Sequence, residues 1–310
     1  MQSTALPDRS QLFARLSEDE IVARYRRVWG PDVGLDELKA QARLEGELTD
    51  RLLRSTPENR WSEFSEAYGR LFSELPWHRT NESLANDRDY EIWRRLLGPA
   101  RKILEIGSGG GGLIRHLAAR GFQAYGSEVT RERGEKCVPN GEGVEWLQTD
   151  GVNLSHFVAE NGFDAVFSDQ VFEHLHPDDH LTHLSEARKV LASGGRYILR
   201  APHRSGGPRD LSEIFGLDEA VFLHLCEPDY ALMHSLCLRA GFDRVSAVLA
   251  SGRLGVALAS PLFLRYQLAI ERLESKFARS QEQKRRFRKL ARRLLAADAV
   301  WIVAEKTRPT

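Results

Sequence analysis

Seven short apolar runs, separated by stretches with helical spacing, organise the chain from about residue 100 onward. The runs cover residues 103–106, 123–128, 144–150, 163–170, 196–200, 244–249 and 299–304. Strands that alternate with helical segments are typical of a sheet covered by helices on both faces. The pattern therefore predicts an α/β domain over residues 99–310, built on a doubly wound, seven-stranded and mostly parallel sheet.

Residues 1–98 show helical spacing without strand-like alternation. The pair Ser17 and Glu20 has the spacing of a capping box and predicts the start of the first helix. Further apolar stripes cover residues 38–52, 61–75 and 90–97, with Trp61 among the inward positions of the third helix. We therefore expect a helical N-terminal cap.

The aromatic stripes of this cap have two interpretations. Such stripes are most often part of a hydrophobic core. In the functional interpretation the cap is a lid that excludes water from a substrate pocket, with Trp77, His78 and Tyr68 as wall residues.

A second helical insertion is predicted at residues 255–297, before the last strand. It carries a basic face between Lys284 and Arg293 opposite an apolar one. Contact with nucleic acid or a membrane is one interpretation. A solvated amphipathic helix is favoured instead, because Glu271 and Glu282 lie nearby in the sequence.

The glycine-rich segment at residues 107–112 directly follows the first predicted strand. Glycines allow a sharp turn and a close approach of the backbone to a ligand, so this segment is a candidate nucleotide-binding loop. Read as Gly-x-Gly-x-x-Gly, it fits a dinucleotide. Read together with Glu105, it resembles the first motif of the class I S-adenosylmethionine-dependent methyltransferases, and the loop spacing alone does not decide between the two ligands.

Acidic residues end the next two predicted strands. Glu128 lies close to the distance of about 20 residues expected for a carboxylate that binds a ribose. Asp150 ends the third predicted strand, where a solvated turn residue is one interpretation.

The fourth strand leads into the phrase Glu173-His174-Leu175, followed by a helix start and the turn at residues 191–195. With the glycine loop and the Ala240-Gly241-Phe242 helix end, this order resembles the class I S-adenosylmethionine-dependent methyltransferases. The resemblance covers roughly residues 100–250 and the final strand. It implies a Rossmann-like transferase with S-adenosylmethionine as its cofactor and S-adenosylhomocysteine as its product.

The resemblance also implies roles for individual residues. Glu105, Gly107, Ser108 and Gly109 would line the methionine and ribose, and Glu128, with Val129 beside it, would take the ribose hydroxyls. Asp150 and Gly151 would border the adenine. Ser168, Asp169 and Gln170 would lie beneath the sulfonium.

The acceptor side is predicted from chemistry at the end of the fifth strand. His203 is a candidate general base, because an imidazole titrates near neutral pH, and His174 is its competitor. Arg204 and Arg209 could hold an acceptor carboxylate or phosphate. We expect a small-molecule acceptor methylated on oxygen.

A metal is not expected. The segment from His174 to His183 holds residue types suited to a transition metal. However, Pro177, Asp178 and Asp179 have the pattern of a first helical turn, which explains the same residues without an ion.

Composition adds few constraints. Lys and Arg together number 44, equal to Asp and Glu, so no global charge recruits nucleic acid or an anionic membrane. The three cysteines lack metal-like spacing, which favours a reducing cytoplasm, and no apolar stretch is long enough for a membrane span. An exposed aromatic face of the cap could support a homodimer.

Three alternatives remain at this stage. A protein or RNA methyltransferase would dock through the basic C-terminal helix. An NAD(P)-dependent oxidoreductase would explain the glycines and Glu128 but not the Glu-His-Leu phrase. A regulatory protein would bind the cofactor without turnover.

Overall fold

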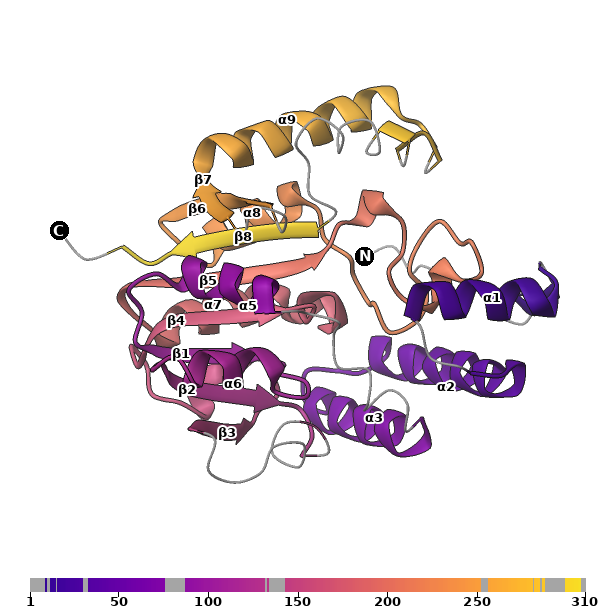
Figure 1. Cartoon of the computed structure of the whole chain (residues 1–310), viewed down its shortest axis with the longest axis horizontal. Helices are drawn as coiled ribbons and strands as arrows, with labels where there is room; N and C mark the ends of the chain where they lie inside the picture. The colour runs from indigo at the N-terminus through magenta and orange to yellow at the C-terminus, as the bar shows by residue number, and fades with distance from the viewer. Residues whose placement is uncertain are drawn as a thin grey trace.

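A computed structural model describes residues 9, 12–14, 16–29, 33–75, 87–131, 133, 143–251, 256–280, 282–284, 286–287 and 299–307. One sheet runs through these ranges (Figure 1). Its strands are β1 (Lys102–Ile106), β2 (Gln123–Glu128), β3 (Val144–Gln148), β4 (Phe163–Asp169), β5 (Leu191–Pro202), β6 (Arg244–Ser251), β7 (Val256–Ser260) and β8 (Ala299–Glu305). The order across the sheet is β3-β2-β1-β4-β5-β8-β6-β7.

The predicted mostly parallel architecture is confirmed. Strands β1 to β5 pair in parallel, whereas β8 is antiparallel to both β5 and β6. Because the order reverses at β1 and β4, the carboxyl ends of these strands leave a crevice, which is where open α/β sheets bind ligands.

The predicted number of seven strands is wrong, because the sheet has eight. The additional strand, β7, pairs antiparallel with β6 and occupies the first positions of the segment predicted to be a helical insertion. A run of only five residues, Val-Ala-Leu-Ala-Ser, has no decisive period, so pairing with β6 determines its conformation. Helix α9 (Pro261–Phe277) follows, with Ser260 as its N-cap.

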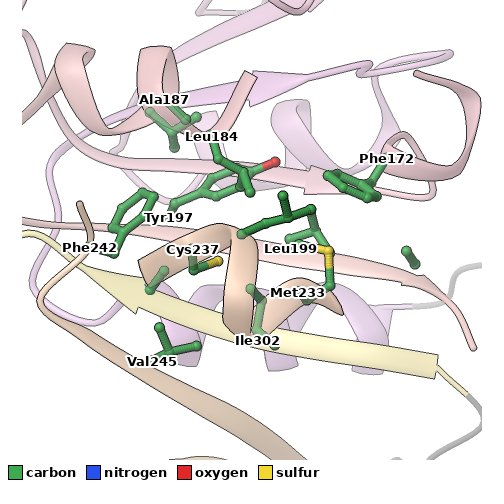
Figure 2. Close-up of a cluster of buried hydrophobic side chains, with 14 of the residues drawn as sticks. Phe172, Leu184, Ala187, Tyr197, Leu199, Met233, Cys237, Phe242, Val245 and Ile302 are labelled. Carbon is green, nitrogen blue, oxygen red and sulfur yellow. The ribbon is translucent and has the colours of Figure 1, made fainter. Parts of the chain in front are cut away.

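Two layers of helices cover the sheet. Helices α5 (Asp87–Leu97) and α6 (Gly112–Ala118) pack their apolar positions on one face. Helices α7 (His180–Val190), α8 (Tyr230–Arg239) and α9 cover the other face. Figure 2 shows this second core, in which Leu184, Met233 and Phe242 meet Tyr197 and Ile302 of the sheet. Helices therefore cover both faces of the central strands, as the apolar runs of β1, β4 and β8 require.

The N-terminal helices lie beyond the carboxyl ends of the parallel strands (Figure 1). They are α1 (Glu18–Trp29), α2 (Leu35–Leu53) and α3 (Arg60–Glu74), which together with α5 match the four predicted helical stretches. The Ser17 hydroxyl accepts a hydrogen bond from the Glu20 amide at 3.3 Å, as the capping pattern predicts. None of the helices within the described ranges is long and apolar enough to cross a bilayer.

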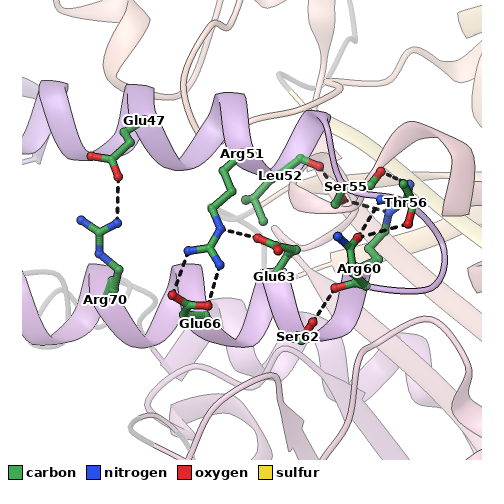
Figure 3. A network of polar contacts seen from close by, with 11 residues as sticks. Glu47, Arg51, Leu52, Ser55, Thr56, Arg60, Ser62, Glu63, Glu66 and Arg70 are labelled. Atoms are coloured by element: carbon green, nitrogen blue, oxygen red, sulfur yellow. Dashed lines mark hydrogen bonds and ion pairs between the residues drawn. The ribbon is translucent and has the colours of Figure 1, made fainter.

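Charged side chains join α2 to α3 (Figure 3). Arg51 on α2 pairs with Glu63 and Glu66 on α3, and Glu47 pairs with Arg70.

The prediction that Trp61 faces inward is wrong, because its side chain is 37% exposed and its ring packs edge-on against Phe157. Helix α3 therefore contacts Phe157 of the α/β domain through Trp61, in addition to its ion pairs with α2.

Candidate functional site

A cavity of about 330 Å³ opens where the carboxyl ends of β1, β2 and β4 face the helical cap. Its floor is the glycine-rich loop and the residues that follow each strand. Its roof consists of side chains of α3 and α5, namely Phe64, Tyr68, Phe72, Asp89, Tyr90 and Trp93. The cavity therefore lies between the predicted N-terminal cap and the predicted α/β domain.

The glycine-rich loop is fixed by requirements that only glycine meets. Gly107, Gly109 and Gly111 have φ values of +68°, +57° and +82°, a region that side chains with a Cβ rarely adopt. A Cβ on Gly107 would lie 2.4 Å from Val171 Cγ2, and one on Gly112 would lie 2.3 Å from the Tyr90 hydroxyl. The loop thus keeps its backbone exposed to the cavity.

Glu128 lies beside this loop at the end of β2. Its carboxylate accepts a hydrogen bond from the Gly109 amide. Burial raises the pKa of Glu128, while Arg133 and hydrogen bonds from Gly109 and Val129 oppose the shift. The carboxylate is therefore held at the cavity wall by the loop itself, with Val129 next to it.

Glu105 ends β1 beneath the loop, next to Ser108 and Gly109 in the cavity lining. Burial, and then the charges of Asp169 and Glu128, raise its pKa well above the usual range. Its Oε2 atom is buried and has no hydrogen-bond partner among the residues described. An unpartnered buried oxygen at this point is free to meet a donor on a ligand.

Asp150 and Gly151 line the same cavity after β3. Asp150 Oδ1 accepts hydrogen bonds from the amides of Val152 and Asn153, both at 2.8 Å. The Asp150 carboxylate therefore organises its own turn, as the alternative interpretation of the sequence expects, while it also borders the cavity.

A buried hydrogen-bond chain supports this turn from below. His183 contacts the Gly151 carbonyl oxygen through Nδ1 at 2.6 Å and the Tyr197 hydroxyl through Nε2 at 2.7 Å. Ser168 Oγ lies 2.7 Å from the same hydroxyl. Ser168 is fully buried and is not among the residues that line the cavity. It therefore lies one layer below the cavity surface, whereas the sequence predicts it at that surface, beneath the sulfonium.

Asp169 and Gln170 do reach the cavity, at the end of β4. Asp169 pairs with Arg200 through two contacts of 2.7 and 2.5 Å. The Arg200 guanidinium lies over the rings of Trp93 and Trp301, a stacking arrangement favourable to Arg. Gln170 has a φ of +56°, a strained conformation for a residue with a Cβ that is found mainly at functional sites.

His174 also lines the cavity, on the side of the helical cap. Its Nδ1 lies 2.9 Å from the Leu223 carbonyl oxygen, and its ring contacts the ring of Tyr68 edge-on. Burial, and then the charge of His224, lower the pKa of His174 to about 3. The side chain is therefore neutral at physiological pH.

Two charged side chains adjoin His174. Burial raises the pKa of Glu173 to about 7, although His224 opposes this shift. Burial would lower the pKa of His224, but a hydrogen bond with Glu227 and the charges of Glu173 and Asp210 raise it to about 9.

The other predicted acceptor-side residues are not brought to the cavity. His203 is 2% exposed, and its Nε2 lies 2.8 Å from Glu271 on α9. Arg204 faces Asp229, and Arg209 faces Glu213. The reason is that β5 continues to Pro202, so the following loop turns toward α8 and α9. Trp77 and His78 lie outside the described residues.

The histidines that follow His174 have individual hydrogen-bond partners. His176 caps the turn before α7 by accepting from the Asp178 amide, and His180 contacts the Leu175 carbonyl oxygen. Asp179 pairs with Arg60 of α3 at 2.6 Å. This segment therefore begins a helix, as the sequence predicts.

Several cavity residues were missed by the sequence analysis. Arg133, Arg200 and Asp89 supply charge, and Phe64 and Phe72 supply much of the apolar wall. Arg200 could have been suspected, because it lies near the end of the fifth strand. Tyr68 lines the cavity as the functional interpretation of the cap expects, whereas Arg133, Phe64 and Phe72 carry no motif, since only the fold brings them to the glycine-rich loop.

The sheet order and the cavity at its switch point define a class I methyltransferase fold. Residues 104–199 match the family model described as a methyltransferase domain. Residues 104–199 therefore carry a methyltransferase domain with the class I fold, as the sequence motifs predict.

Two curated relatives align with this part of the chain. A protein of Mycobacterium tuberculosis described as a probable fatty acid methyltransferase is 32% identical over 108 residues, covering 34% of this chain and 25% of the relative. The glycine/sarcosine/dimethylglycine N-methyltransferase of Actinopolyspora halophila is 32% identical over 119 residues, covering 35% of this chain and 20% of the relative. The alignments thus span a quarter or less of these relatives.

A solved structure with a similar fold is the 1,6-didemethyltoxoflavin-N1-methyltransferase of Burkholderia thailandensis. It was determined with 1,6-didemethyltoxoflavin and S-adenosylhomocysteine bound. The TM-score is 0.50 at 15% identity, covering 82% of this chain and 91% of that one. At this identity the likeness supports the fold.

Proposed function

We propose that this protein transfers a methyl group from S-adenosylmethionine to an oxygen atom of a small molecule. The observation that carries the proposal is the single cavity shared by the glycine-rich loop, Glu128 and the aromatic side chains of α3. One end has the groups that suit an adenosine and an amino acid, and the other is lined by aromatic rings and His174.

The residues present fit this cofactor. Glu128 would take the ribose hydroxyls, and Asp150 and Gly151 would border the adenine. The backbone of Gly107, Ser108 and Gly109, with the unpartnered Oε2 of Glu105 nearby, would face the methionine part. Asp169 and Gln170 would close the cavity from β4.

S-adenosylmethionine supplies, when bound, an electrophilic methyl carbon on a positively charged sulfur. The protein then has to align the acceptor oxygen with that carbon and exclude water. Phe64, Tyr68 and Phe72 would exclude water, because their rings roof the cavity. His174 would contact the acceptor, since it lies at the wall between the floor and α3.

The two curated relatives are described as acting on a fatty acid and on the nitrogen of glycine derivatives. His174 is preferred over His203 on the acceptor side, because His203 is held by Glu271 away from the cavity. A cavity of this size under an aromatic roof favours a small molecule over a macromolecule.

The test is a calorimetric titration of the full chain with S-adenosylmethionine and S-adenosylhomocysteine, with NADH alongside. We expect micromolar binding of the first two and loss of that binding in Glu128→Ala. Binding of NADH alone would support an oxidoreductase and overturn the proposal. A screen of acceptors with methyl-labelled cofactor then separates oxygen from nitrogen acceptors, and cofactor binding without any transfer would indicate a regulatory protein.

A further inference from the structure

Glu173, His174 and His224 meet at the acceptor side of the cavity. Each offers one ligand atom, and the three atoms lie within 4.8 Å of one another. Glu173 and His174 lie in a 3-10 turn (Phe172–His174) after β4, whereas His224 comes from the segment that follows β5. The two imidazole rings are 4.8 Å apart at an angle of 82°.

The carboxylate of Glu173 is the unusual member of this cluster. The residue is fully buried, and within the described part of the chain neither of its oxygens has a hydrogen-bond partner. Buried carboxylates are normally paired or coordinate a metal, because an isolated one is very unfavourable. His224 forms its ion pair with Glu227 instead. Both oxygens of Glu173 are therefore available to a ligand.

The two histidines are oriented as metal-binding histidines usually are. His174 uses Nδ1 toward the Leu223 carbonyl oxygen at 2.9 Å, and His224 uses Nδ1 toward Glu227 Oε1 at 2.8 Å. A ligating histidine typically donates one ring N–H to a carbonyl or carboxylate, which leaves the other nitrogen for the metal. In both side chains this leaves Nε2 as the candidate ligand atom.

We propose that Glu173, His174 and His224 bind one divalent transition-metal cation at the acceptor wall of the cavity. Two imidazoles and one carboxylate suit zinc, manganese or iron better than magnesium or calcium. Three protein ligands leave a coordination position open. Ligands around one ion at about 2.1 Å are closer together than the present cluster, so binding includes a small rotation of the side chains.

The role of the cation rests on the proposed function, whereas its binding does not. His174 lines the cavity, so the open coordination position lies on the side of the acceptor. A cation there would hold the acceptor oxygen in place for methylation. The sequence does not predict this site, because His224 is far from His174 along the chain and no local spacing links them.

The experiment is a calorimetric titration of the chelator-treated full chain with manganese chloride and, separately, zinc chloride. We expect one equivalent to bind, and at least 100-fold weaker binding in both Glu173→Gln and His224→Asn. His234→Asn is the matched control, because His234 lies on α8 outside the cluster, and its affinity should stay within twofold of the unmodified chain.

Cys226 needs its own control. Its backbone amide donates to the Glu173 carbonyl oxygen, and zinc binds thiolates readily. Cys226→Ser should bind manganese and zinc as tightly as the unmodified chain. Loss of binding in that variant would overturn the proposed ligand set.

Three results would overturn the inference itself: less than one equivalent bound, unchanged affinity in both cluster variants, or equal weakening in His234→Asn. Circular dichroism shows whether each variant is folded, and His174→Asn replaces a variant that is not. S-adenosylhomocysteine is titrated in parallel. Metal binding without cofactor binding contradicts the proposed function alone, whereas cofactor binding without metal binding contradicts only the metal site.

Discussion

The two ends of the cavity are built by different means. At the cofactor end, left-handed glycines and strand ends present backbone groups, and Glu128 is held by the loop it adjoins. At the acceptor end, side chains from α3 and from the turn after β4 converge, and His224 lies beside that turn. The cofactor end is built from short segments that directly follow strands, whereas the acceptor end combines residues that are far apart in the sequence.

The difference extends to unpaired polar atoms. Within the described part of the chain, the buried atoms without hydrogen-bond partners include Tyr68 Oη, Glu105 Oε2 and Arg133 Nε at the cavity and both oxygens of Glu173 beside His174. Such atoms destabilise a fold unless a ligand satisfies them. Most of them lie toward the helical cap, so we expect the acceptor end to gain more from its ligands than the cofactor end.

The largest effect is expected from Gly107→Ala, which tests whether backbone shape controls the cofactor end. The new Cβ would lie 2.4 Å from Val171 Cγ2 at a φ of +68°. We expect S-adenosylhomocysteine affinity to fall by several hundred-fold, about 3 to 4 kcal/mol, in a calorimetric titration.

The matched control is Gly69→Ala in α3, where a Cβ meets no atom within 4 Å. It should bind the cofactor normally and become more stable by up to about 1 kcal/mol, because alanine favours a helix. Equal cofactor affinity in the two variants would show that the loop does not contact the ligand.

The second prediction concerns His183, which contacts the Gly151 carbonyl oxygen beneath the cofactor end. Burial lowers the pKa of His183 to about 4, below its ordinary value of 6.5. The unfolded chain therefore binds more protons than the folded chain between these pH values, and stability falls as the pH drops through this window. We expect His183 to account for about 2 to 4 kcal/mol of that loss.

Urea unfolding at pH 7 and pH 4.5 measures this effect. His183→Asn should be less stable at pH 7 and should lose less on acidification. The dependence will not vanish, because burial also lowers the pKa of His180 to about 4. An undiminished acid loss in the variant would assign the effect to other groups.

Glu128→Gln gives the third effect, a 10- to 100-fold loss of cofactor affinity. The amide keeps the size of the side chain but weakens a charge-assisted hydrogen bond, worth about 1.5 to 3 kcal/mol. Glu145→Gln, on β3, is the control. A loss restricted to Glu128→Gln supports its proposed contact with the ribose, and equal affinities would argue against it.

The smallest effect is expected from Tyr68→Phe at the acceptor end. The hydroxyl is buried and lacks a partner among the described residues, so its removal should stabilise the ligand-free protein by about 0.5 to 1 kcal/mol. Cofactor affinity should stay within twofold. Destabilisation in thermal unfolding would mean that the hydroxyl has a structural partner and is not held ready for a ligand.

The sequence predicts the cofactor end better than the acceptor end for a physical reason. Glycine spacing and acids after strands are local signals, and they place Gly107, Glu128 and Asp150 at one cavity. No local signal links Arg133 to the loop, or His224 to Glu173. The prediction that His203 lies at the cavity is wrong. A residue just after a strand reaches a ligand site only if the loop that follows the strand remains at that site, and here the loop leads to Glu271.

The fold shows the same limit at its far edge. The periodicity predicts the parallel strands well, because each is an apolar run bounded by turns. It misses β7, whose five residues become a strand only through pairing with β6. Short apolar segments take their structure from a partner and not from their own pattern.

The position of β8 has a consequence for synthesis on the ribosome. This strand comes last in the chain among the described elements, yet it lies inside the sheet, between β5 and β6. Until it emerges, the outer edge of β5 has no neighbour, and β6 and β7 cannot join the sheet. Completion of the sheet is thus a late, long-range step of folding. A nascent chain that pauses before β8 presents an open strand edge of the kind that aggregates or recruits chaperones.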